Sequence, residues 1–276
     1  MNIKSKYMLS GARYLILIIG AIVILFPIIW AISSSFKSNI EVLKIPVQWI
    51  PKEMKWENYT TPFKERPFAR YFLNSIVSAG FVTISNLFFS SMAGYGFSKF
   101  NIPGKKWLFL FVLSTLMVPI QVIIVPLYLI INNLGWINSY QGLIVPLMVN
   151  GFGVFLMRQF IMGIPDEYMD AARIDGSSEI AIFFRIVLPL SRQALAALGI
   201  FSFVANWDEF LWPLVVINSD KLSTLPLGIA KFQGTYSSQY NQLLAMSLLA
   251  TLPLLIVFVF IQRRFIESLS LSGLKQ

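Results

Sequence analysis

The chain has 276 residues, of which 56% are hydrophobic and only 13% are charged. Soluble domains are usually about 45–50% apolar, so this composition excludes an ordinary soluble protein. The formal net charge is +9, but the basic residues lie between apolar runs and form no basic stripe with interleaved aromatic residues, which argues against nucleic-acid binding. The absence of Cys and His excludes thiol chemistry, Cys/His zinc sites and Ser–His or Cys–His nucleophile pairs, and we expect no catalytic or metal-binding residues.

Six apolar segments are long enough to cross a membrane, because a bilayer core of about 30 Å needs roughly 20 apolar residues in a helix. They cover residues 14–35, 71–95, 107–131, 141–162, 191–217 and 243–261. The first follows a basic lead and could be a secretory signal, but its apolar core is longer than signals usually have, so we predict an uncleaved span. The sequence therefore predicts an all-α integral membrane protein, with one transmembrane domain over residues 1–276.

An even number of spans places both termini on the same side of the membrane. Short connections rich in Lys and Arg are typical of the cytoplasmic side. Lys99, Lys105 and Lys106 lie in one short connection, whereas residues 132–140 carry no charge. We therefore expect both termini in the cytoplasm, and the Pro-punctuated loop 36–70 on the outside as an ordered, turn-rich connection.

The second span contains many small polar residues, which let helices approach closely and hydrogen-bond to one another. They are Asn74, Ser75, Ser78, Ser85, Asn86, Ser90 and Ser91. We expect this span to be buried among its neighbours. Later spans contain prolines that we expect to interrupt them, a feature common in transporters and also found in other membrane proteins. They are Pro119, Pro126, Pro146 and Pro213.

The segment 163–190 is unusually polar for this chain, because five of its thirteen acidic residues fall within positions 166–179. Its pattern predicts two short helices joined at a bend. Acidic residues suit the first helix N-terminus after Pro165, and Gly176 can take the left-handed conformation that ends that helix. Ser177 or Ser178 would then cap the second helix, which should stop near Pro189.

Two interpretations of this segment remain open from the residues alone: a solvated cytoplasmic loop, or an element that docks a soluble partner. Ala171 and Ala172 have little side-chain bulk and would let a helix enter a groove deeply. Apolar residues would supply contact area around them, namely Met169, Ile174, Ile180 and Phe183, and charged residues would supply a polar rim, namely Asp170, Arg173 and Asp175.

The segment resembles the EAA loop of the membrane subunits of bacterial ATP-binding-cassette importers. The resemblance lies in the order of its residues: an acid, two Ala, a Gly four residues later, and an apolar stretch that ends in Leu-Pro. The matching positions are Asp170, Ala171, Ala172, Asp175, Gly176, Leu188 and Pro189. Further stretches resemble carbohydrate-importer permeases over nearly the whole chain, among them "AGYGFSKFNIPGKK", "NWDEFLWPLVV" and "TLPLGIAKFQGTY". The chain departs from the family pattern at Asp170, where the family has Glu, and at Gln193, where a Pro is common.

The resemblance implies a type I ABC importer permease fold, in which the segment 163–190 carries a coupling helix. It implies import of a carbohydrate, such as an oligosaccharide, a disaccharide or a related sugar, across the cytoplasmic membrane of a bacterium. The implied partners are a second permease in a heterodimer, two cytoplasmic ABC ATPases, an extracellular solute-binding protein and membrane lipid. The chain has no G-x-x-x-x-G-K-[ST] phosphate-binding loop, so we expect no cofactor in it and ATP and Mg in the partner ATPase.

Asp208 and Glu209 are the ionisable residues that lie well inside an apolar span. Charge at such depth is costly and usually faces a cavity or a partner. With Asn206 and Trp207 they resemble a segment shared by sugar permeases, which implies a role in the translocation path or between the two permeases. The alternative is that the span ends earlier and the acids are in water.

The external loop 218–242 contains Gln233, Gly234 and Tyr236. In relatives the corresponding loop faces the binding protein, so a docking contact is implied there, and a plain external loop remains the alternative.

Two other functions compete with an ATP-driven importer. A secondary, ion-coupled transporter usually has several ionisable groups in its spans, whereas this chain has one adjacent pair. A non-transport membrane protein, such as a scaffold or an intramembrane enzyme, is the third class, but the chain offers few candidates for catalysis.

Overall fold

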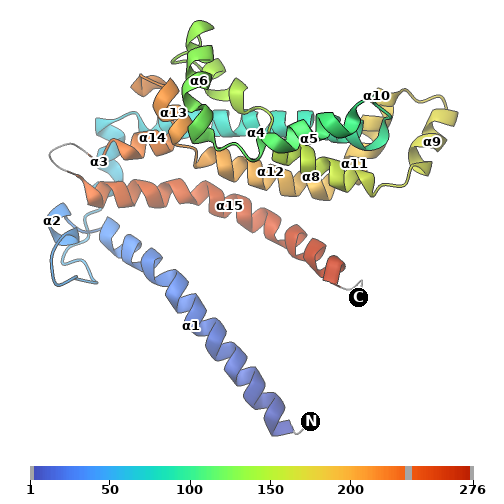
Figure 1. Ribbon diagram of the computed structural model, residues 1–276. Coiled ribbons are helices and arrows are strands. Elements are labelled where there is room, and N and C mark those ends of the chain that lie inside the picture. Colours follow the sequence, from blue (N-terminus) through green and yellow to red (C-terminus); the bar gives the residue numbers. More distant parts are fainter. Residues whose placement is uncertain (1–2, 234–237, 274–276) are drawn as a thin grey trace. The chain divides into compact units, whose positions relative to one another are not determined.

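The computed structural model describes the backbone of residues 3–233 and 238–273 and the side chains of residues 13–233 and 238–259 (Figure 1). Within these ranges all regular structure is helical apart from one isolated antiparallel bridge between Gln233 and Ser238. The chain divides into two compact units, Met1–Phe68 with Ile229–Leu252 and Ala69–Gly228 with Pro253–Gln276. The prediction of an all-α fold is confirmed.

The helices of the first half are α1 (Ile3–Ser35), α2 (Asn39–Val42), α3 (Glu57–Glu65), α4 (Phe68–Lys99), α5 (Lys105–Thr115), α6 (Ile120–Asn133), α7 (Tyr140–Ile144) and the 3-10 turn η1 (Val145–Leu147). The second half contains α8 (Gly151–Met162), α9 (Glu167–Ile174), α10 (Glu179–Ile182), the π-helical turn η2 (Phe183–Val187), α11 (Leu188–Leu190), α12 (Arg192–Trp207), α13 (Leu211–Val216), the 3-10 turn η3 (Asp220–Leu222), α14 (Leu225–Ala230) and α15 (Tyr240–Gly273).

Among the described residues, three continuous helical stretches are long and apolar enough to cross a membrane: Arg13–Ser35, Phe68–Lys99 and Tyr240–Val259. Three further candidates are pairs of helices that bend sharply at a short break. The pairs are α5 with α6 at 99°, α7 and η1 with α8 at 42°, and Glu179–Leu190 with α12 at 78°. If each pair counts as one span, the structure has six, the predicted number.

The prolines account for only some of these breaks. Pro119 precedes α6 in an extended conformation and marks the 99° bend, and Pro146 lies in the turn η1. Pro126, in contrast, lies inside α6 and does not interrupt it. The expectation that Pro126 breaks its span is therefore wrong, because the helix absorbs the missing N–H.

The predicted single span 191–217 is also wrong. The helix α12 ends at Trp207, and a separate helix, α13, begins at Leu211. At the start of α13, Glu209 Oε1 accepts a hydrogen bond from the backbone N–H of Trp212, 3.0 Å away. Such a side-chain cap satisfies a donor that the start of α13 leaves without an intrahelical partner.

The unit made of Met1–Phe68 and Ile229–Leu252 is organised around the buried amide of Asn58. Its nitrogen donates to the carbonyl oxygens of Ser35 and Lys37, both at 2.8 Å, and its oxygen accepts from Asn241 at the start of α15, also at 2.8 Å. One side chain thus connects the end of α1, the helix α3 and α15. The loop 36–70 is ordered, as predicted, and it also contains the short helices α2 and α3, which were not predicted from the sequence.

The helix α4 lies in the unit made of Ala69–Gly228 and Pro253–Gln276, apart from its first residue. It is the most buried of the three continuous candidate spans. Asn86 donates to Ser202 Oγ of α12 (3.2 Å) and accepts from Ser90 Oγ (2.7 Å). The backbone of Gly153 in α8 lies against the same two α4 side chains. Small and polar residues thus let α8 and α12 approach α4, and the prediction that this span is buried is confirmed.

This close approach predicts the effect of adding one methyl group. In Gly153→Ala the new Cβ would overlap Ser90 Oγ and lie 2.7 Å from Asn86 Oδ1. Overpacking of this kind typically costs about 1–3 kcal/mol, so we expect a lower unfolding temperature for the purified protein in detergent. Gly80→Ala in α4 is the matched control, because its Cβ would meet nothing within 4 Å. An equal effect of both substitutions would contradict the close contact.

Candidate functional site

The segment 163–190, which we call the elbow, forms the two short helices that the sequence predicts. Gly176 has φ +82° and ends α9, with its N–H bonded to the carbonyl of Arg173 (3.0 Å). Ser178 caps α10 by accepting a hydrogen bond from the N–H of Ala181 (3.3 Å). Of the two candidate caps, Ser178 is therefore the one that acts.

The second helix continues one residue beyond the predicted end. It widens into η2, where the N–H of Leu188 donates to the carbonyl of Phe183 five residues earlier, and it ends as α11 at Leu190. Pro189 has no N–H and its ring crowds the preceding turn, so a wider turn before it relieves the clash. The 78° bend follows directly, between Leu190 and Arg192. π-helical turns are rare and often occur at functional sites.

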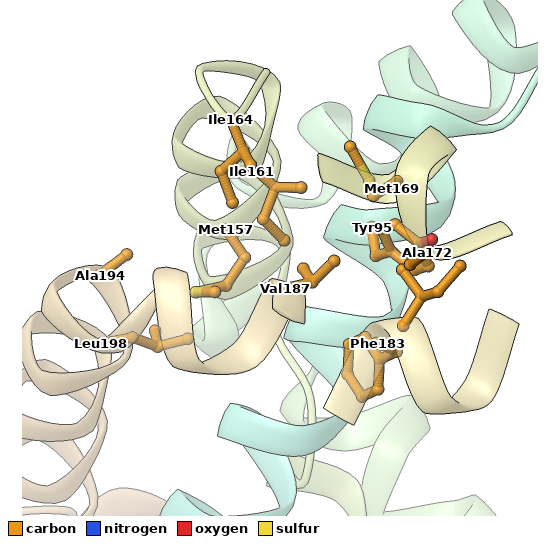
Figure 2. Close-up of a cluster of buried hydrophobic side chains, with 11 residues drawn as sticks. Tyr95, Met157, Ile161, Ile164, Met169, Ala172, Phe183, Val187, Ala194 and Leu198 are labelled. Carbon is orange, nitrogen blue, oxygen red and sulfur yellow. The ribbon is translucent and has the colours of Figure 1, made fainter. Parts of the chain in front are cut away.

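One face of the elbow packs against its own helix bundle (Figure 2). Met169 and Ala172, three residues apart on α9, are buried with Phe183 of η2. The same cluster contains residues of α4, α8 and α12 and Ile164, two residues beyond the end of α8; the others are Tyr95, Met157, Ile161, Ala194 and Leu198. The prediction that Met169 and Phe183 supply contact area for a partner is wrong, because both are buried in the chain itself.

The outer face of α9 carries the exposed apolar residues Tyr168, Ala171 and Ile174, which we call the α9 patch. The side chain of Ile174 is 86% exposed, and Ile180 of α10 is 72% exposed. Asp170 and Asp175, also exposed, lie beside the patch in the sequence. The two alanines thus have opposite environments: Ala171 is exposed and Ala172 is buried.

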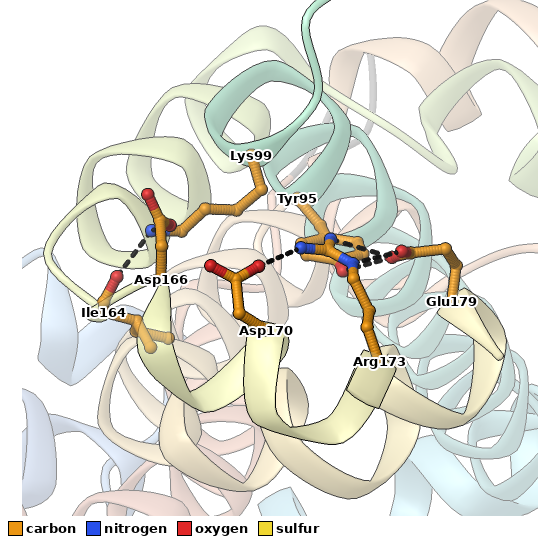
Figure 3. A network of polar contacts seen from close by, with 7 residues as sticks. All are labelled: Tyr95, Lys99, Ile164, Asp166, Asp170, Arg173 and Glu179. Atoms are coloured by element: carbon orange, nitrogen blue, oxygen red, sulfur yellow. Dashed lines mark hydrogen bonds and ion pairs between the residues drawn. The ribbon is translucent and has the colours of Figure 1, made fainter. Parts of the chain in front are cut away.

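A chain of polar contacts holds the elbow in shape (Figure 3). Arg173 donates from Nη1 to Asp170 Oδ1 (2.8 Å) and from Nε to Glu179 Oε1 (2.7 Å), which joins α9 to α10. The hydrogen bond to Glu179 is the main reason why the pKa of Arg173 is raised above its usual value, so the guanidinium stays charged. Asp170 is therefore paired within the elbow.

Two α4 residues that the sequence interpretation missed also contact the elbow. Tyr95 donates its hydroxyl to Glu179 Oε2 (2.7 Å), and Lys99 donates to the carbonyl of Ile164 (2.5 Å) and to Asp166 Oδ1 (2.6 Å). A signal was available in the sequence: a polar residue pair four apart at the end of an apolar span lies on one helix face.

The residues 206–209 have separate environments. Asn206 and Glu209 line a small hollow, whereas Asp208 is exposed at the end of α12. Trp207 is 1% exposed and packs against Phe72 and Phe203, with ring centroids 5.9 and 5.7 Å apart. Of the two readings of this segment, the earlier end of the helix is confirmed, and the role of its residues stays a prediction.

The hollow beside Asn206 and Glu209 is small, with a cavity volume of about 10 Å³, roughly enough for one water molecule. Ser78 of α4 and Thr224 add two hydroxyl groups to its lining, and sequence reasoning missed both. Thr224 is buried and its Oγ1 has no hydrogen-bond partner in the described part of the chain. The remaining lining residues are Val82, Leu143, Leu147 and Pro213.

The external loop 218–242 is described only in part. Gln233 is exposed and forms the isolated bridge with Ser238. Gly234 and Tyr236 lie outside the described residues, so their predicted docking role stays a prediction.

Comparisons with known proteins agree on one kind of protein. The model of the family described as "Binding-protein-dependent transport system inner membrane component" matches residues 86–270. The arabinooligosaccharides transport system permease protein AraQ of Bacillus subtilis (strain 168) is 39% identical over 254 residues, which cover 91% of this chain and 90% of AraQ. The sn-glycerol-3-phosphate transport system permease protein UgpE of Pectobacterium atrosepticum is 36% identical over 275 residues, which cover 97% and 98%.

Solved structures show the same fold. A chain of a bacterial ABC transporter involved in the import of the acidic polysaccharide alginate superposes with a TM-score of 0.83 at 22% identity, over 95% of this chain and 98% of that one. The family model covers more than half of the sequence, including the elbow and the segment 206–209. The chain therefore belongs to the family of inner membrane components of binding-protein-dependent transport systems.

Proposed function

We propose that the chain is the membrane-spanning subunit of an ATP-driven importer that moves a carbohydrate across the bacterial cytoplasmic membrane. Family membership supports import that depends on a binding protein. The permeases AraQ and UgpE are named for arabinooligosaccharides and for sn-glycerol 3-phosphate, both of which carry free hydroxyl groups. A related sugar is therefore the substrate class that the comparisons support best.

The α9 patch is the observation that carries the coupling role. It is an exposed apolar surface with the smallest side chain, Ala171, between Tyr168 and Ile174, on a helix whose other face is fixed to the bundle. Exposed apolar surfaces with polar rims commonly mark protein interaction sites. The partner is a cytoplasmic ABC ATPase that binds ATP and Mg, because this chain has no phosphate-binding loop.

The other residues that match the family motif have different roles within the elbow. Gly176 sets the turn between α9 and α10, and Leu188 and Pro189 follow the π-helical turn at the 78° bend. Ala172 allows close packing of α9 on the bundle, and Asp175 ends α9. The ATPase thus contacts Ala171 directly, and the remaining positions orient the surface that it meets.

The full assembly contains this chain, a second permease, two ATPases and an external solute-binding protein that docks near Gln233, Gly234 and Tyr236. Both termini and the elbow face the cytoplasm. A matching solved structure, with a TM-score of 0.66 at 18% identity, is of a bacterial alginate ABC transporter in complex with an alginate pentasaccharide-bound periplasmic protein, which supports a binding protein as a partner.

The hollow beside Asn206 and Glu209 is the candidate part of the translocation path. Its polar lining combines a carboxylate, an amide and two hydroxyl groups, which together offer donors and acceptors for sugar hydroxyl groups. The unpartnered Thr224 hydroxyl supports this role, because a buried polar group without a partner is costly unless a ligand or water satisfies it.

The test is uptake by the purified complex in proteoliposomes, with the ATPase and second permease that co-purify with the chain and the cognate binding protein. We expect uptake of a labelled oligosaccharide that requires ATP inside the vesicle, at the cytoplasmic face of the complex. Uptake should also require the binding protein outside the vesicle. Uptake that follows an imposed ion gradient in the absence of ATP would instead show a secondary transporter and would refute the proposal.

The variant Glu209→Gln tests the role of the hollow separately from any role of Asp208, the exposed acid beside it. The amide can still accept the hydrogen bond from Trp212 N–H, so α13 stays capped, but the negative charge in the hollow is lost. A hydrogen bond to a charged group contributes about 1.5–3 kcal/mol, so we expect sugar uptake to fall roughly tenfold or more while the ATPase still co-purifies. Asp208→Asn should have a smaller effect, because Asp208 is exposed. Equal losses in both variants would contradict the role of the hollow.

A further inference from the structure

Two side chains at the cytoplasmic end of α4 contact both halves of the elbow. Tyr95 and Lys99 are four residues apart, so they lie on one face of the helix, and Figure 3 shows both directed toward the elbow. Lys99 contacts the chain just before α9, and Tyr95 contacts the first residue of α10.

The contact before α9 is well fixed. The Lys99 ammonium donates to the carbonyl of Ile164 and to Asp166 Oδ1, and the Lys99 side chain is only 7% exposed, whereas Asp166 is 72% exposed. An exposed ion pair alone contributes little. Here a shielded ammonium also bonds to a backbone carbonyl, so it fixes the main chain that leads into α9.

The contact at α10 reaches back to α9. The hydroxyl of Tyr95 bonds to one oxygen of Glu179, and the other oxygen of Glu179 accepts from Arg173 of α9. The ring of Tyr95 is buried and packs against Phe100 and Phe183, with centroids 5.1 and 5.9 Å apart. The hydroxyl is therefore held in place by a packed ring, and it connects α4 to both short helices.

The opposite end of α4 holds the start of the external loop 218–242. Asn74 donates to the carbonyls of Lys221 (3.0 Å) and Ser223 (2.8 Å), and Ser75 Oγ accepts from the N–H of Leu225 (2.8 Å). Residues 74 and 95 are about 30 Å apart along a helix that rises 1.5 Å per residue. No proline occurs in α4, and it is one continuous helix, whereas the other candidate spans that lie wholly in Ala69–Gly228 are bent pairs.

We propose that Tyr95 and Lys99 are positioning residues that make the elbow and α4 move as one body during transport. A displacement that the ATPase imposes on α9 then reaches α4, and through α4 the loop that Asn74 and Ser75 hold on the external side. This inference rests on the proposed function. It assigns the connection between elbow and span to two α4 side chains that lie outside the EAA motif.

The test uses two conservative substitutions in the intact complex. Tyr95→Phe removes one oxygen and keeps the buried ring, and Lys99→Met removes the charge and keeps the length of the side chain. We expect both variants to assemble with the ATPase and to hydrolyse ATP, but the double variant should import about tenfold less sugar per ATP hydrolysed. Tyr128→Phe and Lys106→Met are matched controls, because Lys106 is exposed and, within the described residues, neither side chain forms a hydrogen bond or ion pair with the elbow.

A distance measurement separates this role from a purely structural one. The chain has no Cys, so spin labels at Asn101→Cys and Ser177→Cys report the distance between the end of α4 and the turn of the elbow, in a complex whose other subunits lack Cys. We expect the same distance with and without ATP in the parent, and an ATP-dependent change in the double variant. An unchanged distance, or an unchanged ratio of sugar to ATP, would overturn the proposal.

If the double variant fails to assemble, Tyr95→Phe alone decides, because it leaves the packing of α4 intact. A normal ratio of sugar to ATP in that variant would overturn the role of Tyr95. If the parent complex itself shows no ATP-driven uptake, the proposed function fails, and that result is read from the parent before any variant is compared.

Discussion

Replacing Ala171 with Arg should abolish sugar uptake while the chain still inserts and folds. Ala171 is exposed in the middle of the α9 patch, whereas the residues that fix α9 to the bundle, Met169 and Ala172, face the other way. An Arg at position 171 therefore disturbs no contact within the chain, but it places a long charged side chain where a partner surface must come close. Disruption of one central contact at a protein interface commonly reduces the binding free energy by about 2 kcal/mol or more, which is roughly a 30-fold loss of affinity.

The measurement is co-purification of the ATPase with the variant, together with ATP-dependent uptake in proteoliposomes. Asn101→Arg is the matched control, because it adds the same charge at an exposed position in the short connection after α4, outside the elbow. Ala172→Arg should behave differently from both, since its side chain would enter the buried cluster and destabilise the protein itself. Full uptake by Ala171→Arg would show that the α9 patch does not meet the ATPase.

The local shape of the elbow could be predicted from its sequence. Gly176 and Ser178 are strong signals of helix ends, because each satisfies a specific backbone requirement, and the acidic residues at the start of α9 suit the positive end of the helix dipole. The number of spans followed from hydrophobic length in the same way. Both kinds of prediction depend on residues near one another in the chain: the shape of the elbow is confirmed, and six spans result if each bent pair of helices counts as one.

The features that the sequence did not reveal depend on tertiary contacts. Whether Met169 faces a partner or the bundle is decided by the cluster that α4, α8 and α12 form with it, and α4 comes from a distant part of the sequence. The separate helix α13 begins beside a hydrogen bond from Trp212 N–H to Glu209, which hydrophobicity alone cannot register. The roles of Tyr95 and Thr224 likewise became visible only when α4 was placed beside the elbow and the hollow.

The elbow combines a fixed face with an exposed one, and this combination explains why the family motif contains residues of such different kinds. A docking surface on a loose loop would move when the ATPase moved, and little of that movement would reach the spans. The buried cluster around Met169 and the contacts of Arg173 with Asp170 and Glu179 oppose such local motion. Small residues are then needed at two places: on the surface at Ala171 and in the packed face at Ala172.

The turn between the two short helices should be as important for coupling as the surface itself. Gly176 has φ +82°, a conformation that costs a residue with a side chain roughly 1–2 kcal/mol. A Cβ at this position would meet nothing within 4 Å, so the effect of a substitution comes from the backbone alone. In Gly176→Leu we expect the turn to relax toward negative φ, which changes the angle between α9 and α10 and lowers sugar uptake about tenfold.

Gly176→Asn provides the matched comparison, because Asn adopts the left-handed conformation more readily than other residues with side chains. We expect Gly176→Asn to retain most of the sugar uptake. Gly176→Leu should still insert in the membrane but import less sugar per ATP hydrolysed. Circular dichroism and the yield of purified chain report whether each variant is folded. Equal impairment of Leu and Asn would mean that the open space beside Gly176 is filled by the ATPase, and that size at this position, not backbone conformation, limits coupling.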